Sequence, residues 1–339
     1  MERYDRQIRL QKIGQRGQAE IGGKTVLIVG CGALGTHASE QLVRAGIGKI
    51  KLIDMDRVSW SNLQRQALFD ENDAARTVYK VEAAKKRLNK INSNVEVESY
   101  QEAFTLQSGM LLDDVDLVLD CTDNFTVRGA INQLAAEMGL PFIFASCASV
   151  AGSVMFVQPD KGPCLQCVFP DLGELTQTSC DQLGVFTPLV SFVASIQVSL
   201  ALQYFVCPEE VPVDQLLSVD NWSMTINRFQ VTKQANCMTC GDGDGSVKQS
   251  AQPLMVRLCG TSAYKVAVSD FSADQLEKIL KAKRIEYRRT TKLMTFTIDT
   301  HDFTYFNSGQ FYLYNFATLR EATAYYEKLK ALCEKEIIK

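Results

Sequence analysis

The amino-acid sequence predicts an α/β fold, in which a doubly wound, mostly parallel sheet is followed by a small α+β module at the carboxyl end. Three observations lead to this prediction. Short apolar runs alternate with stretches of helical periodicity up to residue 145, a glycine-rich loop joins the first run to the first helix, and the pattern changes after residue 153. Alternating strands and helices favour a parallel sheet that is covered by helices on both faces.

Continuous apolar runs indicate strands that are buried on both faces of the sheet. The expected strands are residues 25–29, 49–53, 95–98, 115–119 and 141–145. Between them, apolar residues recur at the spacing of a helix. The expected helices are residues 33–44, 81–91 and 125–138.

The second part of the chain has a different pattern. Residues 154–157 and 218–231 are expected to form strands of a more antiparallel kind, on either side of an uncharged helix at 189–206. A polar, glycine-rich segment begins at Cys237 and marks a boundary. We therefore expect a first domain at residues 1–245 and a second at residues 251–339.

The second domain is expected to be a compact α+β module whose role the sequence does not reveal. Its expected strands lie near residues 255–258, 265–268, 295–298 and 310–314, and its expected helices near 273–281 and 319–335. The aromatic residues from Phe303 to Phe306 and from Phe311 to Tyr314 are expected to be alternating strand core rather than a surface for stacking bases.

Composition and charge exclude several classes of function. The net charge of −3 gives no electrostatic footprint for nucleic acid or for an anionic membrane surface. The first residues are charged and carry no apolar run, so we expect no export and a cytoplasmic location. The uncharged helix is expected to be a core or subunit-interface helix, because polar residues that would be costly in lipid interrupt it. These are Ser191, Ser195, Gln197, Ser199 and Gln203.

Eleven cysteines and only two histidines are present. In a chain that stays in the cytosol, so many cysteines favour metal ligation or catalysis over disulfides. The scarcity of histidine counts against mechanisms that need an imidazole base.

The first strand ends in a glycine-rich loop, Gly30-Cys-Gly-Ala-Leu-Gly35, which fits G-x-G-x-x-G. Gly30 permits a tight turn, Gly32 lets the backbone approach a phosphate, and Gly35 allows close packing of helix on strand. The helix N-terminus then offers free N–H groups to an anion. Asp54 stands at the end of the next strand, where a carboxylate accepts ribose hydroxyls. This Rossmann-like loop fits NAD or ATP, and by itself it slightly favours NAD.

The segment after the second strand decides between these nucleotides. It reads Asp54-Met-Asp-Arg-Val-Ser-Trp-Ser-Asn62-Leu-Gln-Arg65-Gln, and Lys80 follows fifteen residues after Arg65. Together with Arg3-Tyr-Asp-Arg6-Gln-Ile and Leu119-Asp-Cys-Thr-Asp123-Asn, this run resembles the MoeB/ThiF adenylyltransferases, which are relatives of the ubiquitin-activating enzymes. The resemblance spans roughly residues 2 to 241, and its motifs are long and stand in the family's order.

The resemblance implies a role for each matching residue. The three loop glycines line the nucleotide site, Asp54 meets the ribose, and Asn62, Arg65 and Lys80 face the triphosphate of ATP. Asp123 helps to hold Mg²⁺. The alternative for Arg65 and Lys80 is a solvated charged face.

Arg6 has a different kind of role in this family pattern. It reaches across a dimer interface into the partner's site, which implies a homodimer. The alternative is an ordinary surface arginine near the N-terminus.

The cysteines form two Cys-x-x-Cys pairs, Cys164 with Cys167 and Cys237 with Cys240. Two such pairs can make a four-thiolate tetrahedral Zn²⁺ site that has no open position and is therefore structural. The alternatives are a redox pair or unpaired core thiols, but neither pair opens a helix in a thioredoxin-like unit. The resemblance supports zinc at these places.

Cys180 lies in a polar loop before the uncharged helix. By resemblance this is the position of a cysteine that some family members use in sulfur transfer or as an acyl acceptor, and the alternative is an inert loop thiol. The remaining cysteines stand in apolar contexts and are expected to be small core residues. They are Cys31, Cys121, Cys147, Cys207, Cys259 and Cys333.

The sequence thus predicts an enzyme that uses ATP and Mg²⁺ to adenylylate the C-terminal glycine carboxylate of a ubiquitin-like sulfur-carrier protein ending in Gly-Gly. Pyrophosphate leaves, and a sulfur donor acts on the adenylate in molybdopterin or thiamine biosynthesis. The alternatives are an NAD-dependent oxidoreductase, a non-catalytic scaffold that binds a ubiquitin-like protein, and an enzyme that adenylates a peptide or a tRNA base. The sequence does not distinguish a MoaD-like carrier from a ThiS-like one.

Overall fold

The computed structural model describes residues 2–170, 184–237, 239–241, 255–257, 263–266, 271–289, 293–306 and 311–337. The chain divides into two compact units, Met1–Val247 and Lys248–Lys339.

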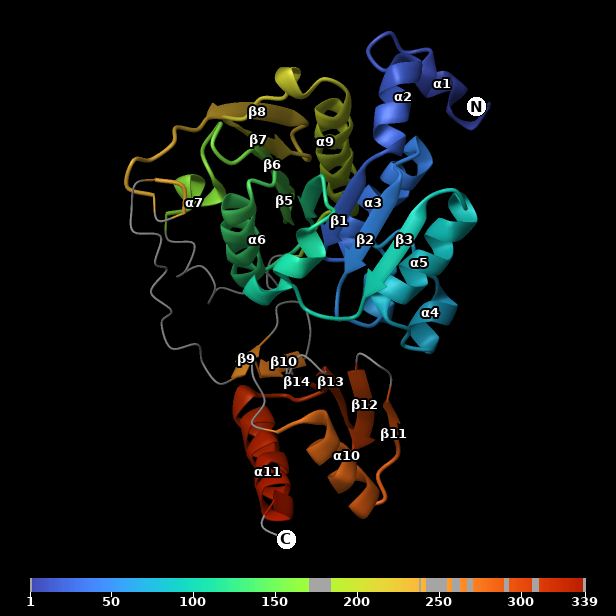
Figure 1. Cartoon of the computed structure of the whole chain (residues 1–339), viewed down its shortest axis with the longest axis vertical. Coiled ribbons are helices and arrows are strands. Elements are labelled where there is room, and N and C mark those ends of the chain that lie inside the picture. The colour runs from blue at the N-terminus through green and yellow to red at the C-terminus, as the bar shows by residue number, and fades with distance from the viewer. Residues whose placement is uncertain are drawn as a thin grey trace. The chain divides into compact units, whose positions relative to one another are not determined.

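The first unit is built on an eight-stranded sheet in the order β3-β2-β1-β4-β5-β6-β7-β8 (Figure 1). The pairs from β3 to β5 are parallel, and those from β5 to β8 are antiparallel. The sheet is parallel from β3 to β5 and antiparallel beyond, so it is mixed but mostly parallel, which confirms the predicted fold class. The strands are β1 Thr25–Val29, β2 Lys49–Ile53, β3 Glu96–Tyr100, β4 Leu117–Asp120, β5 Phe142–Ala148, β6 Ala151–Val157, β7 Gln215–Asp220 and β8 Thr225–Gln230.

Helices cover both faces of this sheet. In the first unit these are η1 Glu2–Tyr4, α1 Asp5–Ile8, α2 Gly14–Gly22, α3 Ala33–Ala45, η2 Trp60–Asn62, α4 Glu71–Ala75, α5 Lys80–Ile91, η3 Leu106–Leu112, α6 Phe125–Met138, α7 Leu165–Val168, α9 Thr187–Val206 and η5 Pro208–Glu210.

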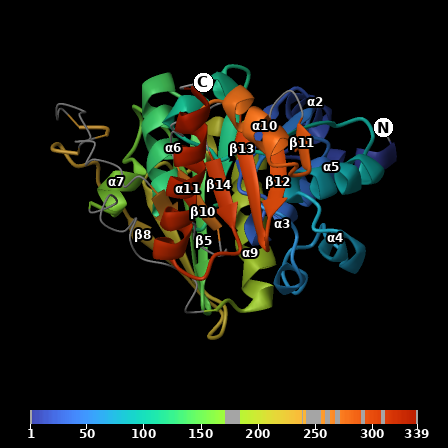
Figure 2. The same cartoon turned by 90° about the horizontal axis from the view of Figure 1, so that it is seen from below.

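Two cores lie on the two sides of β1, because alternate residues of a strand point to opposite faces. Val26 and Ile28 join the core that includes α3, α5 and α9. Leu27 and Val29 join the core that includes α6. Figure 2 shows α6 on the opposite side of the sheet from α9.

The helix α2 was not predicted from the sequence. It has three glycines, and its only buried aliphatic side chain is Ile21, so its own helical propensity is weak. Packing explains why it forms. A Cβ on Gly17 would lie 2.9 Å from Cγ1 of Val206, so glycine allows α2 to lie directly against α9.

The uncharged helix α9 is, among the described residues, the one long and apolar enough to cross a membrane. It packs instead against α3, β5 and β6. Its fully buried Gln197 donates from Nε2 to the carbonyls of Asp120, at 3.0 Å, and Ile143, at 2.8 Å. The predicted core helix is therefore confirmed, and its central polar residue is satisfied by backbone acceptors.

The second unit, within its described residues, is an antiparallel sheet in the order β11-β12-β13-β14-β10-β9 with two helices. Phe303 and Tyr305 are buried, which confirms that β13 belongs to the core, and the ring centroids of Phe296 and Phe303 lie 5.0 Å apart. The predicted alternation is wrong, because Thr304 and Tyr312, between the expected core positions, are buried as well. The short strand β11 was not predicted, because its residues are polar and half-buried or exposed. The bounds are β9 Met255–Arg257, β10 Ala263–Val266, α10 Ala273–Ala282, β11 Tyr287–Arg289, β12 Leu293–Ile298, β13 His301–Phe306, β14 Phe311–Tyr314 and α11 Leu319–Ile337.

Candidate active site and metal centre

The glycine loop joins β1 to α3 at the carboxyl ends of the parallel strands. Gly30 has φ +92°, and a Cβ there would lie 2.7 Å from the carbonyl oxygen of Cys121. A Cβ on Gly35 would lie 1.9 Å from the carbonyl oxygen of Gly30. Gly32, the N-cap of α3, is different, since its nearest neighbour would be Nε2 of Gln66 at 3.8 Å. The fold therefore requires Gly30 and Gly35, whereas a Cβ at Gly32 would make only an ordinary van der Waals contact with the Gln66 side chain.

Asp54 follows β2 and lies beside this loop. Its Oδ2 accepts a hydrogen bond from the Cys31 N–H at 2.7 Å, and its Oδ1 accepts one from the Asp56 N–H at 2.7 Å. Burial, helped by the charge of Asp56, raises the pKa of Asp54 against the attraction of Lys80. The carboxylate is thus held in place at the edge of the loop, as predicted for its position.

Lys80 is the first residue of α5 and is buried. Its Nζ lies 2.8 Å from Oδ2 of Asp56. Burial opposes its charged form, but the attraction of Asp56 and Asp54 outweighs this and raises the pKa of Lys80 above its ordinary value. A buried ammonium is therefore present near the loop, and Asp56 is its partner.

Asp123 comes three residues after the end of β4. Its side chain is accessible to solvent. The surrounding protein nevertheless desolvates the carboxyl group, and this desolvation, together with the negative charge of Asp56, raises the pKa of Asp123 to about 6. The positive charges of Lys80 and Arg128 lower the pKa, but by less. Asp54, Asp56, Lys80 and Asp123 therefore form one electrostatic cluster at the carboxyl edge of the sheet.

The segment that holds Asn62 and Arg65 is attached to the first turn of α3. The Ala67 N–H donates to Oγ1 of Thr36 at 3.2 Å, and Gln66 lies next to Gly32. Asn62 uses its Oδ1 to accept the Ser59 N–H at 2.9 Å, so its NH₂ is the group left for a ligand. Arg65 donates from Nη1 to the carbonyl of Ser61 at 2.9 Å.

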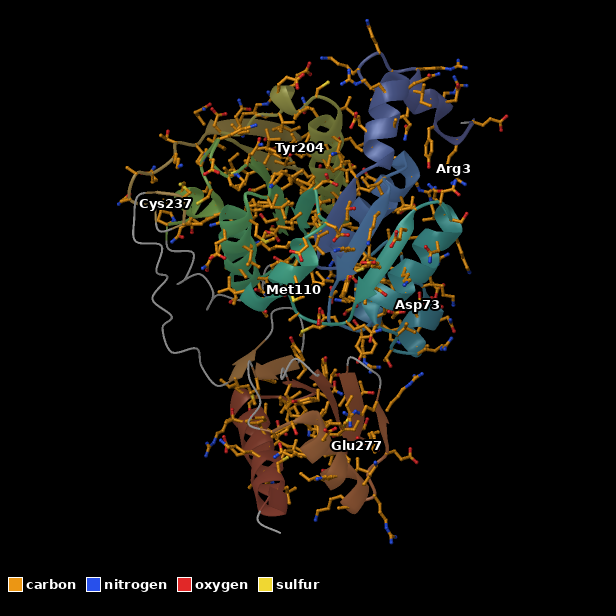
Figure 3. The ribbon with its side chains drawn as sticks, viewed as in Figure 1. Arg3, Asp73, Met110, Tyr204, Cys237 and Glu277 are labelled. Atoms are coloured by element: carbon orange, nitrogen blue, oxygen red, sulfur yellow. The ribbon has the colours of Figure 1, made fainter. Side chains whose placement is uncertain are left out.

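Arg6 lies at the other end of the sheet. Its neighbour Gln7 donates to the carbonyl of Ala45 at 3.0 Å, and Ala45 is the last residue of α3. The loop is at the first residue of α3, and thirteen residues at about 1.5 Å each separate the two ends by about 20 Å. Figure 3 shows Arg3, close to Arg6 in sequence, at the opposite end of the sheet from Asp73 of α4. The exposed Arg6 is therefore not brought to the loop of its own chain.

The four cysteines of the two Cys-x-x-Cys pairs converge. All four Sγ atoms lie within 4.8 Å of one another, and Cys237 is labelled in Figure 3. The Sγ atoms of Cys164 and Cys237 are 3.5 Å apart, as are those of Cys167 and Cys240. Metal–sulfur bonds of about 2.3 Å would place the sulfurs roughly 3.8 Å apart in a tetrahedron. The cluster therefore has the dimensions of a four-thiolate metal site.

Neighbouring N–H groups point at two of these sulfur atoms. Asn132 of α6 donates from Nδ2 to Sγ of Cys164 at 3.7 Å and accepts the Leu165 N–H at 2.9 Å. The Gln234 N–H points at Sγ of Cys167, 3.5 Å away. Such N–H donors stabilise negative charge on sulfur and orient ligands.

The other predicted cysteines divide into three groups. Cys31, Cys121 and Cys333 are buried, as predicted for core residues, and Cys147 and Cys207 are only half-buried. Cys180 and Cys259 lie outside the described residues.

Several residues of this edge were missed from the sequence. Asp56 is part of the run that carries the family resemblance, but no role was assigned to it from the sequence. Its position two residues after Asp54, just after the end of the same strand, could have indicated that it lies at the site. Asp120, Arg128 and Gln197 are buried polar residues that meet only in three dimensions. No sequence pattern pairs them, because they come from separate elements.

Comparison with known proteins settles the relationship. The model of the ThiF family matches residues 4–239. This chain belongs to the ThiF family. A sulfur carrier protein ThiS adenylyltransferase of Bacillus subtilis (strain 168) is 32% identical over 333 residues, which cover 96% of this chain and 98% of that protein. A protein of the same description from Escherichia coli (strain K12) is 34% identical over 245 residues, covering 70% of this chain and 94% of that protein.

A solved structure resembles this ThiF family member in fold. The crystal structure of E. coli MccB with succinimide superposes with a TM-score of 0.62 at 22% identity, and the match covers 70% of this chain and 74% of that one. The Bacillus relative extends over the second unit as well, so that unit is shared with a relative of nearly the same length. The family favours ATP over NAD as the nucleotide of the loop.

A pair of glycine variants tests how the loop is built. Gly35→Ala forces a Cβ onto a backbone carbonyl, so we expect a loss of about 2 kcal/mol or more in the free energy of unfolding. Gly32→Ala adds only an ordinary van der Waals contact with Gln66, and we expect it to change stability by less than about 0.5 kcal/mol. Chemical denaturation of both variants measures this, and equal stability losses would contradict the geometry.

Proposed function

We propose that this chain is an adenylyltransferase that activates the C-terminal glycine carboxylate of a ubiquitin-like sulfur carrier ending in Gly-Gly, with release of pyrophosphate. Its membership of the ThiF family supports this proposal. So does the relative named for adenylylation of ThiS, which matches over 98% of its own length. The observation that carries the proposal is the buried Lys80, whose charge acts on Cys31 of the glycine loop and which has Asp54, Asp56 and Asp123 around it.

The nucleotide fits this edge by charge and shape. The absence of a side chain at Gly32 would let phosphates approach the N-terminus of α3, where helix N–H groups attract anions. Asp54 would accept the ribose hydroxyls. Asn62, Arg65 and Lys80 would hold the triphosphate, and Lys80 would exchange Asp56 for a phosphate oxygen.

Mg²⁺ fits the residues present. Asp123 and Asp56 offer carboxylate oxygens, which a hard cation prefers. The pKa of Asp123, raised to about 6, reflects desolvation and a neighbouring negative charge, and a cation there would relieve both. Bound Mg²⁺ would supply neutralisation of phosphate charge.

The reaction needs fixed positive charge more than it needs a base. The carrier's C-terminal carboxyl has a pKa of about 3.5 and is already ionised at neutral pH. Its oxygen attacks the α-phosphorus of ATP, the bond to the β-phosphate bridging oxygen breaks, and pyrophosphate leaves. An anion thus meets an anion, and negative charge grows on the leaving group. Lys80, Arg65 and the helix N-terminus would stabilise that charge.

The adenylate has a further use in this proposal. Sulfide-level sulfur from a sulfur-donor enzyme would attack the carbonyl carbon of the acyl-adenylate, the bond from that carbon to the phosphate oxygen would break, and AMP would leave. The product would be a thiocarboxylate for thiamine or molybdopterin biosynthesis. Cys180 is proposed as a thiol that takes part in this transfer. The nine cysteines of the described residues are all free of disulfides, which fits a reducing compartment such as the cytoplasm.

Exchange of ATP with pyrophosphate tests the first step. We expect exchange that depends on one Gly-Gly-ended carrier, and Arg65→Ala should lower the rate about 100-fold, because a phosphate-binding cation is lost. The matched control is Arg44→Ala, an exposed arginine paired with Glu40, which should leave the rate unchanged.

Absence of carrier-dependent exchange would contradict the proposal. If the chain binds ATP but no carrier in a panel of MoaD-like and ThiS-like proteins supports exchange, adenylylation of a sulfur carrier is wrong.

We also propose a homodimer. Arg6 lies about 20 Å from the loop of its own chain by the length of α3, so its role at a phosphate site requires the partner's Arg6.

Mixed dimers test this arrangement. One chain carries Arg6→Ala and the other Arg65→Ala, each with its own affinity tag. If Arg6 acts across the interface, the Arg6→Ala chain keeps Arg65 and receives an intact Arg6, so one site of two works. We expect about half of the wild-type exchange rate, whereas both pure variant dimers are nearly inactive. An inactive mixed dimer would show that Arg6 acts in its own chain, and a fully active pure Arg6→Ala dimer would show that Arg6 has no role in the reaction.

Zn²⁺ is the proposed occupant of the four-cysteine cluster, in a structural role, because all four coordination positions are filled by thiolates. We expect about one zinc per chain by elemental analysis. Cys237→Ser should remove it and lower the thermal midpoint by about 10 °C, which corresponds to a loss of roughly 4 kcal/mol in a unit of this size. Cys207→Ser, which lies outside the cluster, is the control and should retain the metal. Retention of full zinc by Cys237→Ser would exclude this ligand set.

A further inference from the structure

The loop between β4 and α6 carries Asp123 out of the core. Asp120, the last residue of β4, is fully buried, and Asp123 is exposed only three residues later. Asn124 then caps α6, accepting the Val127 N–H at 2.8 Å. The backbone between Asp120 and Asn124 therefore sets the direction of the Asp123 side chain.

Two buried charged side chains hold this short backbone. Oδ1 of Asp120 accepts the Thr122 N–H at 3.0 Å and the Thr122 hydroxyl at 2.7 Å. Nη2 of Arg128 donates to the Thr122 carbonyl at 2.7 Å. Both backbone groups of Thr122 are thus bound, and its carbonyl belongs to the peptide that joins it to Asp123.

Arg128 is fixed from several directions. It is 3% exposed, and its guanidinium carbon lies 4.8 Å from the centre of the Phe125 ring and 5.0 Å from that of Phe144. Its Nε faces Oδ2 of Asp120 at 3.6 Å. Within the described chain, neither of these two atoms makes a hydrogen bond.

This arrangement is a poor way to gain stability. A buried ion pair loses hydration on both partners, and apolar residues of similar volume often serve the fold equally well. The pair with unsatisfied Nε and Oδ2 is therefore better explained by what it orients. Three of its hydrogen bonds end on Thr122, directly before Asp123, and a longer one runs from Nη2 of Arg128 to the carbonyl of Ala145 at 3.4 Å.

We propose that Arg128 is a positioning residue which, with Asp120, locks the Thr122–Asp123 peptide so that the Asp123 carboxylate is directed at a divalent cation bound with ATP. This inference rests on the proposed nucleotide chemistry and adds the support behind the cation ligand. Asp123 contacts the cation, and Arg128 acts only through the backbone.

The test is binding of a non-hydrolysable ATP analogue, measured by calorimetry with and without Mg²⁺. Arg128→Met should weaken binding about 10-fold or more with Mg²⁺, as expected when the support of a metal ligand is removed, and about twofold or less without it. Arg44→Met, an exposed arginine on α3, should change neither value. Equal losses with and without Mg²⁺, or a wild-type affinity that ignores Mg²⁺, would overturn the proposal.

Two further variants separate positioning from folding. Asp120→Leu combined with Arg128→Met removes both buried charges, so the chain should stay folded with a similar thermal midpoint but still lose the Mg²⁺-dependent affinity. A wild-type affinity in this variant would mean that the pair serves only the fold. Asp123→Asn should lose the same Mg²⁺-dependent affinity. Adding Arg128→Met to this variant should not lower the affinity further, because Arg128 acts only through Asp123. Additive losses would contradict the proposal.

These measurements need no carrier protein. If the wild-type chain showed no carrier-dependent exchange, the proposed function would be wrong. The role of Arg128 would still be tested, because it is measured by nucleotide binding alone.

Discussion

The close approach of Gly35 to the carbonyl of Gly30 determines where the rest of the candidate site can lie. Because no side chain separates them, α3 begins directly against the end of β1, and its N-terminal N–H groups open at the carboxyl edge of the sheet. Asp54 is joined to the same loop through the Cys31 N–H. Thr36 in the first turn of α3 then anchors the segment that carries Asn62 and Arg65.

At this edge of the sheet three acidic side chains surround one buried lysine. Asp54, Asp56 and Asp123 surround the buried Lys80, so an incoming triphosphate meets three carboxylates. Binding of ATP to such a site is favourable only if additional cations accompany it. In the proposed enzyme these cations are Mg²⁺ at the carboxylates, Arg65, and Arg6 of a second chain. The acidic character of the site would then link nucleotide affinity to the metal and to dimer assembly.

The sequence was sufficient where function depends on local spacing. The glycine loop, Asp54 and Lys80 lie within short runs whose strand–loop–helix context can be read from periodicity, and both Cys-x-x-Cys pairs are visible as pairs. It was insufficient where partners come from distant elements. Arg128 meets Asp120 only because α6 turns back onto β4, and α2 forms only because α9 covers it. Arg6 was recognised, but its distance from the loop follows only from the length and direction of α3.

The helix α9 has a consequence for how the chain is made. It is a 20-residue apolar segment without charge, which on its own resembles a membrane insertion signal and an aggregation-prone stretch. Its docking surface is formed by α3, β5 and β6, all of which precede it in the chain. During synthesis from the N-terminus, that surface can therefore exist before α9 emerges. The order of elements along the chain therefore allows α9 to be covered as soon as it emerges, and a circular permutation that placed α9 first would remove that protection.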